Sequence, residues 1–270
     1  MKQLFHIENN PGDNTELVLS IRLGERHFCF AVTNKNGNEL YRLVYCTNDE
    51  WTEEALDEFL AAYPALKQAY DQVLVTYDHS LAVLTPSSYY RVEDTELLLK
   101  SMYGEQLPSQ IISDLVAEHQ LYNSYVVPKE ILDWMSRKYP AGNFQHQYSL
   151  AIKKISGVNP EGRIQVDFRT NDFTLVTIKG SQILLAQTFS YSTPEDVLYY
   201  LLKVCHQFSL SQQEVQVELS GLIDHESALY KELYLYFLHT RFREACWNDP
   251  GNEYPAHFFT SLNDLAQCAS

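Results

Sequence analysis

The sequence predicts an α/β protein built from two related halves. Residues 16–46 and 162–191 each contain three strand-like apolar runs joined by two tight turns. In both halves an amphipathic helix, an apolar strand and a further helix follow, which gives the order β-β-β-α-β-α twice. Phe28 aligns with Phe173 at a separation of roughly 145 residues, which is the scale of a whole-domain duplication and not of a solenoid repeat.

The halves meet at a loop of Ser, Gly, Val, Asn and Pro at residues 156–160. We therefore expect an N-terminal domain at residues 1–157 and a C-terminal domain at residues 158–270. A chain of 270 residues is long enough for two such domains, each with its own hydrophobic core.

The first half starts with a polar, turn-rich lead-in at residues 1–15. Apolar residues then alternate along the first expected strand, which is typical of a strand covered on at least one face. Asn36-Gly37 favours a hairpin turn because both residues accept positive φ. The three strands of this half's meander are expected at residues 17–22, 27–33 and 40–45.

Helices and shorter strands complete the first half. A helix is predicted at residues 51–63, where acidic residues occupy the first turn. A second helix is predicted at residues 92–103. The residues expected to face inward from these helices are Leu56, Phe59, Leu60, Leu97, Leu98 and Met102. The other predicted elements are strands at 72–77, 81–84, 111–117, 121–127 and 147–155, and a helix that begins at Pro128.

The second half repeats the pattern. Thr193-Pro194 marks a helix start, with Thr as the cap and Pro at the first helical position. Asp224 is expected to cap a second helix that extends through Phe237. The strands of this half are expected at residues 164–169, 173–178, 183–189 and 214–219.

Composition disfavours several classes of protein. The formal net charge is −15, and a chain this acidic repels phosphate backbones and anionic membrane surfaces. The five cysteines are widely spaced and form no C-x-x-C pair, so neither a zinc ribbon nor a redox pair is indicated. No apolar run reaches the ~20 residues of a membrane helix, and no signal peptide is recognised. We expect a cytoplasmic protein that binds neither nucleic acid nor membranes.

The order of the elements and three short motifs indicate a family. The motifs are Leu84-Thr85-Pro86-Ser87 followed by Tyr90, Val126-Val127-Pro128, and YPAHFF at residues 254–259. They are similar to an uncharacterised bacterial family catalogued as domain of unknown function 3822. The element order resembles the actin-like ATPase (ribonuclease H-like) fold of actin, sugar kinases and heat-shock chaperones. This resemblance implies two halves that face a cleft, and the family implies no reaction.

The resemblance also implies where a nucleotide site would lie. In ATP-using members of the fold, the first two strands of each half meet at a turn that carries an acid and a glycine. Residues 20–24 (SIRLG) keep the glycine and lack the acid, whereas residues 167–171 (DFRTN) keep the acid and lack the glycine, although Asn171 can adopt positive φ. The expected adenosine loop has one glycine, Gly221. The candidate residues of this degenerate cleft are Arg22, Gly24, Asp167, Arg169, Asn171 and Gly221.

Two other polar groups have simpler interpretations than catalysis. Asp224, His225 and Ser227 are the residue types of a nucleophilic triad, but neighbours in sequence rarely point at one another, and a helix cap explains them better. Asp78-His79 follows a strand, where sites often lie, yet a turn role is favoured. The nine histidines show no metal-ligand spacing, so no metal site is expected.

Two functions remain open. The helices of the second half carry more tyrosine than one face can bury, which is typical of protein-interaction surfaces. The favoured hypothesis is a non-catalytic actin-like protein that binds another protein and needs no cofactor. The alternative is a nucleotide- or sugar-phosphate-binding enzyme that uses ATP and magnesium. There Arg22 and Arg169 would hold anions, and Asp167 would be the general base or a metal carboxylate.

Overall fold

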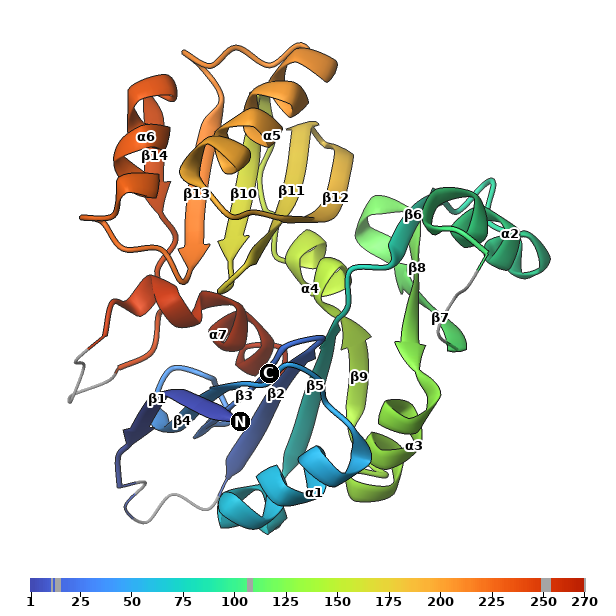
Figure 1. Cartoon of the computed structure of the whole chain (residues 1–270), viewed down its shortest axis with the longest axis vertical. Helices are drawn as coiled ribbons and strands as arrows, with labels where there is room; N and C mark the ends of the chain where they lie inside the picture. The colour runs from blue at the N-terminus through green and yellow to red at the C-terminus, as the bar shows by residue number, and fades with distance from the viewer. Residues whose placement is uncertain (11, 13–15, 106–108, 249–253, 270) are drawn as a thin grey trace. The chain divides into compact units, whose positions relative to one another are not determined.

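The computed structural model describes residues 1–10, 12, 16–105, 109–248 and 254–269. Its contacts divide the chain into two compact units, whose elements are labelled in Figure 1. The first unit comprises Met1–Leu150, Trp247–Gly251 and Leu262–Ser270, and the second comprises Ala151–Cys246 and Asn252–Ser261. The sequence pattern places the boundary between residues 157 and 158. The structure divides the chain after Leu150 and also returns Leu262–Ser270 to the first unit.

The first unit is built on a sheet in the order β1-β4-β3-β2-β5-β9. Neighbouring strands are antiparallel from β1 to β2 and parallel from β2 to β9. Its strands are β1 (Lys2–Glu8), β2 (Leu17–Gly24), β3 (His27–Asn34), β4 (Leu40–Thr47), β5 (Gln72–Asp78) and β9 (Asn143–His146).

Strand β1 corrects the expectation of an irregular lead-in at residues 1–15. It pairs antiparallel with β4 along the edge of the sheet. Ile7 is the buried residue of this strand, and Phe5 packs edge-on against Tyr45 with ring centroids 5.9 Å apart. Such an edge strand gives a weak sequence signal because backbone pairing holds it more than burial does.

Helices α1 (Glu53–Ala62) and α3 (Lys129–Lys138) lie side by side on one face of this sheet (Figure 1). Phe59 of α1 packs on Phe28 of β3 with ring centroids 4.3 Å apart. Trp134 of α3 donates a hydrogen bond from Nε1 to Asp57 Oδ1 of α1 at 2.9 Å. The predicted inward residues of α1 are confirmed as buried: Leu56, Phe59 and Leu60.

The end of the chain packs on the opposite face of the same sheet. Leu265 and Ala269 join Val18, Leu74 and Leu150 in one buried cluster. Val18 and Leu74 lie on neighbouring parallel strands, β2 and β5, so their side chains share a face. The returning segment therefore completes the core of the first unit.

Helix α4 (Gln147–Lys153) corrects the strand predicted at residues 147–155. The strand of this region, β9, ends at His146. Tyr148, Leu150 and Ile152 alternate along the sequence, yet all three have no exposed surface. A short apolar run fits an enclosed helix as well as a strand, so its period could not decide between them.

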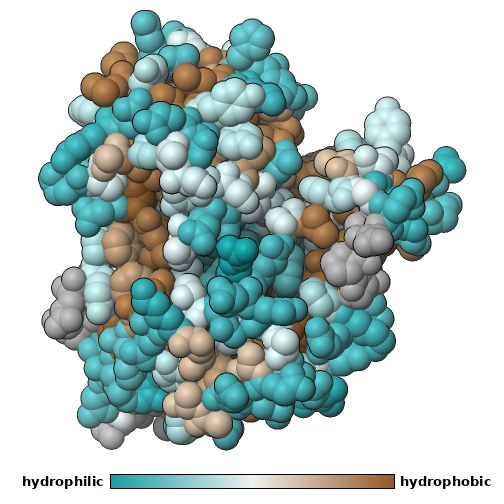
Figure 2. Space-filling view, in the orientation of Figure 1, coloured by the Kyte–Doolittle hydropathy of each residue, from teal (hydrophilic) through white to brown (hydrophobic). Residues whose placement is uncertain are grey.

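A smaller sheet in the order β6-β8-β7 also belongs to the first unit. Helix α2 contacts its strand β6. The predicted inward face of α2 is wrong, because Leu97, Leu98 and Met102 are exposed by 71%, 37% and 51% whereas Leu99 has no exposed surface. Figure 2 shows apolar atoms among hydrophilic ones over this region. The elements are β6 (Ala82–Pro86), α2 (Val92–Tyr103), β7 (Ser109–Val116) and β8 (Leu121–Pro128).

The second unit is built on a sheet in the order β12-β11-β10-β13-β14. Its strand order and directions match those of β4-β3-β2-β5-β9 in the first unit. A duplicated domain would leave this repeated order, and the duplication itself stays a prediction. The strands are β10 (Asn159–Phe168), β11 (Asp172–Gly180), β12 (Gln182–Ser190), β13 (Gln216–Gly221) and β14 (His239–Phe242).

Helices α5 (Pro194–Gln207) and α6 (Ala228–Tyr236) pack against each other in the second unit. Thr193 is the N-cap of α5, as the sequence predicts, and it forms a capping box with Asp196. Helix α6 begins later than predicted, because Ser227 and not Asp224 is its N-cap. The remaining short helices are η1 (Pro64–Lys67), η2 (Ala117–His119), η3 (Ala256–Phe259) and α7 (Thr260–Ala266). Within the described ranges, every helix is too short or too polar to cross a membrane.

Candidate functional site

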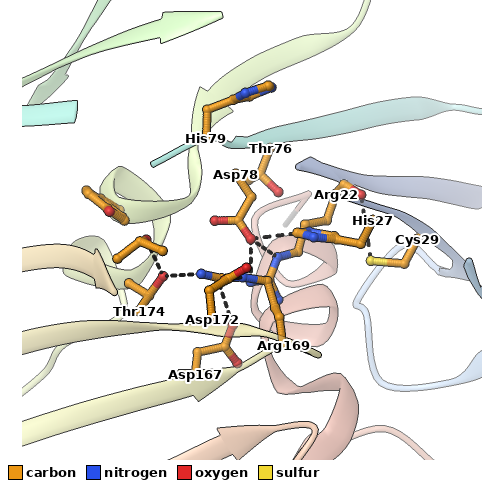
Figure 3. Close-up of polar contacts among 12 residues, drawn as sticks. Arg22, His27, Cys29, Thr76, Asp78, His79, Asp167, Arg169, Asp172 and Thr174 are labelled. Atoms are coloured by element: carbon orange, nitrogen blue, oxygen red, sulfur yellow. Dashed lines mark hydrogen bonds and ion pairs between the residues drawn. The ribbon is translucent and has the colours of Figure 1, made fainter. Parts of the chain in front are cut away.

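The first half-site lies at the end of β2 in the first unit. Arg22 projects from β2 and Asp78 ends the parallel neighbour β5, where it lies opposite Gly24. The Arg22 guanidinium donates to Asp78 Oδ2 from Nε at 2.9 Å and from Nη2 at 2.6 Å. Both residues are at least 95% buried. Figure 3 shows Arg22 and His27 directed at the same carboxylate.

Two residues of β3 complete this cluster. His27 Nε2 lies 3.2 Å from Asp78 Oδ2, and Cys29 Sγ contacts the Arg22 carbonyl oxygen at 3.6 Å. A Cβ on Gly24 would lie 2.2 Å from the His27 ring, so the glycine leaves room for that ring. Residues 20–24, which the resemblance aligns with a phosphate-binding turn, are thus the last part of β2. The chain reverses direction after Gly24.

Asp78 has a different role from the turn residue expected. Its carboxylate is the buried counter-charge of a guanidinium that the enzyme hypothesis assigns to anions. Removing one partner of a buried ion pair costs about 3–5 kcal/mol, because it leaves an uncompensated charge in the interior. The sequence pattern marks the strand end but gives no sign of this pairing, since Arg22 and Asp78 are 56 residues apart.

The second half-site lies at the adjacent ends of β10 and β13 in the second unit. Asp167 Oδ1 accepts a hydrogen bond from Ser220 Oγ at 2.9 Å. The Arg169 guanidinium donates from Nε to Asp172 Oδ1 and from Nη2 to Thr174 Oγ1, the latter at 3.0 Å (Figure 3). Arg169 Nη1 lies 3.9 Å from Asp167 Oδ2. This unit brings together Asp167, Arg169, Asn171 and Gly221, the candidates of its half.

Gly221 serves backbone packing at this half-site. Its φ is +78°, and a Cβ there would lie 2.1 Å from the carbonyl oxygen of Phe168. The next amide, of Leu222, donates to the same oxygen at 2.8 Å. Glycine is therefore required at this position by the close approach of the Phe168 backbone and by the positive φ.

Asn171 does not compensate for the missing glycine in the way predicted. In the part of the chain that the structure describes, positive φ among non-glycine residues is found at Gln120 and Ser209. Asn171 is exposed in the turn between β10 and β11, where its carbonyl oxygen accepts from the Tyr191 amide at 3.0 Å. Asn171 therefore does not take the positive φ that its residue type allows.

A buried charge that the sequence analysis missed lies next to the second half-site. Glu218 of β13 accepts hydrogen bonds from Gln165 Nε2 at 3.0 Å and from Arg241 Nη2 at 2.5 Å. Burial raises the pKa of Glu218, but these hydrogen bonds outweigh it and hold the pKa below its usual value. The three residues occupy paired positions on β10, β13 and β14. The sequence does not reveal this register, so it gives no sign that the three side chains meet.

The Asp224–Ser227 run does not form a triad. Ser227 Oγ accepts from the Tyr230 amide at 3.1 Å as the cap of α6, and Asp224 Oδ1 accepts from the Glu226 amide at 2.7 Å. The His225 ring stacks on Tyr230 with centroids 4.4 Å apart. Among the described residues, no group of three His, Cys, Asp or Glu side chains is placed to hold a metal ion.

The chain is similar to one protein family and to several solved structures. A family model described as "Protein of unknown function (DUF3822)" matches residues 7–240. No curated protein matches the sequence. Among solved structures, the chain is similar to a protein with actin-like ATPase fold and unknown function from Bacteroides thetaiotaomicron. The identity is 19% and the TM-score 0.79, over 94% of this chain and 97% of that chain.

Two further structures show the same fold at lower similarity. A chain of the PilM-PilN type IV pilus biogenesis complex has 11% identity and a TM-score of 0.63, over 95% of this chain and 99% of that chain. The ethanolamine utilization protein EutJ from Carboxydothermus hydrogenoformans has 9% identity and a TM-score of 0.53, over 96% and 92%. The chain has the actin-like ATPase fold, as the order of its elements predicts.

Proposed function

Since the chain belongs to the family described as protein of unknown function DUF3822 and has the actin-like ATPase fold, we propose that it is a non-catalytic member of that fold which binds another protein. The observation that carries the proposal is an exposed apolar surface at the end of α6. The arrangement of the two half-sites supports its non-catalytic part.

The exposed surface consists of Tyr234, Leu235, Tyr236 and Leu238, which we call the α6 patch. These side chains are exposed by 58%, 76%, 44% and 66%. Leu233, which directly precedes the patch, and Phe237, which lies within it, have no exposed surface and anchor the segment in the core of the second unit. Large apolar and tyrosine side chains on a fixed frame are typical of interface centres.

The half-sites use their charged groups internally. Arg22 is paired with Asp78 in the first unit, and Arg169 is paired with Asp172 in the second. A phosphate would have to displace these carboxylates, which are near and already aligned. Gly221 faces the backbone of Phe168, so it offers no open loop for a nucleotide.

One of the similar structures favours protein binding over chemistry. The PilM-PilN complex takes part in type IV pilus biogenesis. One chain of that complex has the same fold as 95% of this chain. The actin-like fold can thus act through association, and we extend that role to this chain.

The proposal predicts that charge in the α6 patch abolishes association. The tagged protein should recover a partner from cells that naturally express it. Leu235→Glu combined with Leu238→Glu should lower that recovery at least tenfold, because central apolar anchors contribute about 2 kcal/mol or more each. Quantitative mass spectrometry of the co-purified proteins measures the recovery.

The matched control is Leu97→Glu, which places the same substitution at an exposed leucine of the first unit. It should recover as much partner as the unchanged protein. Both variants should unfold at the same denaturant concentration as the unchanged protein. A chain that is recovered alone, or a partner retained by the double variant, would contradict the proposal.

The alternative function is nucleotide or sugar-phosphate binding with altered loops, and Asp167 favours it. This carboxylate lies one residue before the end of β10, is 14% exposed and is hydrogen-bonded to Ser220. A thermal-shift titration with Mg-ATP, ADP and GTP separates the two functions. Ligand at 100 times its Kd would add about 2.7 kcal/mol of stability, and we expect no shift at millimolar concentration.

A further inference from the structure

The first unit contains a pocket of about 290 Å³, and Gly24 of the first half-site is one of its lining residues. Its lining comes from the end of β2 and the turn after it, the segment before α1, the segment after β5, the end of β8 and the start of α3. The apolar part of the lining consists of Leu23, Trp51, Leu81, Val126, Pro128 and Ile131. A pocket of this size accommodates one large side chain and the backbone that carries it.

Two buried polar atoms of the lining residues lack a hydrogen bond. Among the described residues, Trp51 Nε1 and His79 Nε2 have no hydrogen-bond partner, although the residues are 5% and 8% exposed. A buried polar group without a partner costs about 1–3 kcal/mol. Burial lowers the pKa of His79 to about 4, so its ring is neutral at pH 7 and can donate or accept. Both atoms are enclosed by the protein, so a ligand in the pocket meets the apolar lining and the charged groups beside it.

The charge of the rim defines the ligand further. The acidic residues of the lining are Glu25, Asp49, Glu50 and Glu130, against one cation, Arg26. Glu25 is held by the amide and hydroxyl of Ser80, at 3.0 and 2.6 Å, so its carboxylate is fixed at the mouth. An acidic rim over an apolar lining complements a basic side chain with a long apolar stem.

We propose that this pocket binds an arginine or lysine side chain of a partner protein. The basic head lies at the acidic rim, and the apolar stem lies against Trp51, Val126 and Ile131. The inference rests on the proposed function, since it identifies the chemistry of a partner segment. It uses a surface separate in sequence from the α6 patch.

The indole N–H of Trp51 provides a direct measurement. The chain has three tryptophans, and their indole signals can be followed in the ¹⁵N-labelled full chain by NMR. The Trp51 signal is assigned by its loss in Trp51→Phe. Trp134 Nε1 already donates to Asp57, so its signal reports on the intact fold.

The probe is the capped peptide Leu-Ala-Arg-Ala-Leu, and its control carries citrulline, a neutral isostere, in place of arginine. We expect the Arg peptide at millimolar concentration to shift the Trp51 signal and the citrulline peptide to shift it much less. Glu50→Gln with Glu130→Gln should weaken binding of the Arg peptide about three- to tenfold. Glu195→Gln, which changes an exposed acid of the second unit, should not.

Each other outcome overturns the inference. No shift with the Arg peptide excludes a basic side chain, and equal shifts with both peptides exclude the role of the rim. A shift with spermidine as large as with the Arg peptide assigns the pocket to a free polyamine. If the Arg peptide does not shift the Trp51 signal, but a partner is recovered and its recovery depends on the α6 patch, this inference fails and the proposed function stands.

Discussion

Arg22 and Arg169 lie in the two half-sites, and each forms an ion pair with a carboxylate of its own unit. Alternation along β2 places Arg22 on a buried face of the sheet, which by itself implies a counter-charge. The identity of that counter-charge, Asp78, depends on the parallel pairing of β2 with β5. The sequence therefore predicts the candidate residue, and only the register reveals what the residue does.

Gly221 gives a prediction at the residue scale. Gly221→Ala should destabilise the second unit by more than about 3 kcal/mol, because the new Cβ meets the Phe168 backbone and φ is +78°. Gly180→Ala is the matched control, since its φ is +61° and nothing lies within 4 Å of the added Cβ. It should cost only the left-handed strain, about 1–2 kcal/mol. Chemical denaturation measures the loss of unfolding free energy in each variant. Equal losses would contradict the close approach of Gly221 to the Phe168 backbone.

Elements with strong local signals were predicted correctly, and those that depend on their surroundings were not. The capping box at Thr193 confirms the start of α5. The alternating buried residues of α4 predict a strand where the structure has a helix. The inward face predicted for α2 is wrong because Leu97, Leu98 and Leu99 allow more than one apolar stripe. Neither ambiguity can be resolved by periodicity, since the deciding contacts come from other elements.

Helix α2 carries the prediction at the scale of an element. Leu99→Ala should destabilise the protein by about 2–5 kcal/mol, because this side chain has no exposed surface. Leu97→Ala, two positions earlier on the same helix, should change stability by less than about 0.5 kcal/mol, because Leu97 is 71% exposed. Urea unfolding compares the two. A larger loss of stability in Leu97→Ala than in Leu99→Ala would support the orientation of α2 predicted from the sequence.

At the scale of the molecule, the two sheets repeat one strand order, while the chain crosses between the units more than once. The last segment, Leu262–Ser270, returns to the first unit and packs on β2 and β5. Asn263 Nδ2 donates to the Gly37 carbonyl oxygen at 2.8 Å, and Gln72 Nε2 donates to the Ala269 carbonyl oxygen at 3.1 Å. The core of the first unit is therefore completed only when Leu265 and Ala269 have been made.

This return gives the prediction for the whole molecule. Leu265→Ala should cost about 2–5 kcal/mol, since Leu265 is 1% exposed in the cluster with Val18 and Leu74. Hydrogen exchange should accelerate in β2 and β5 and stay nearly unchanged in β10 and β11. Cys268→Ser, at an exposed position three residues later, should leave both units unchanged. Equal acceleration in the two units would show that they unfold as one.

The sequence alone determined the fold class, most elements of both sheets and the positions of the candidate residues, because those features depend on local periodicity, turns and caps. Tertiary structure decided which unit the C-terminal segment completes, how α2 and α4 are placed, and which carboxylates neutralise Arg22 and Arg169. It also decided that Trp51 and His79 line one pocket. These outcomes depend on contacts between residues far apart in the chain, and no local pattern encodes such contacts.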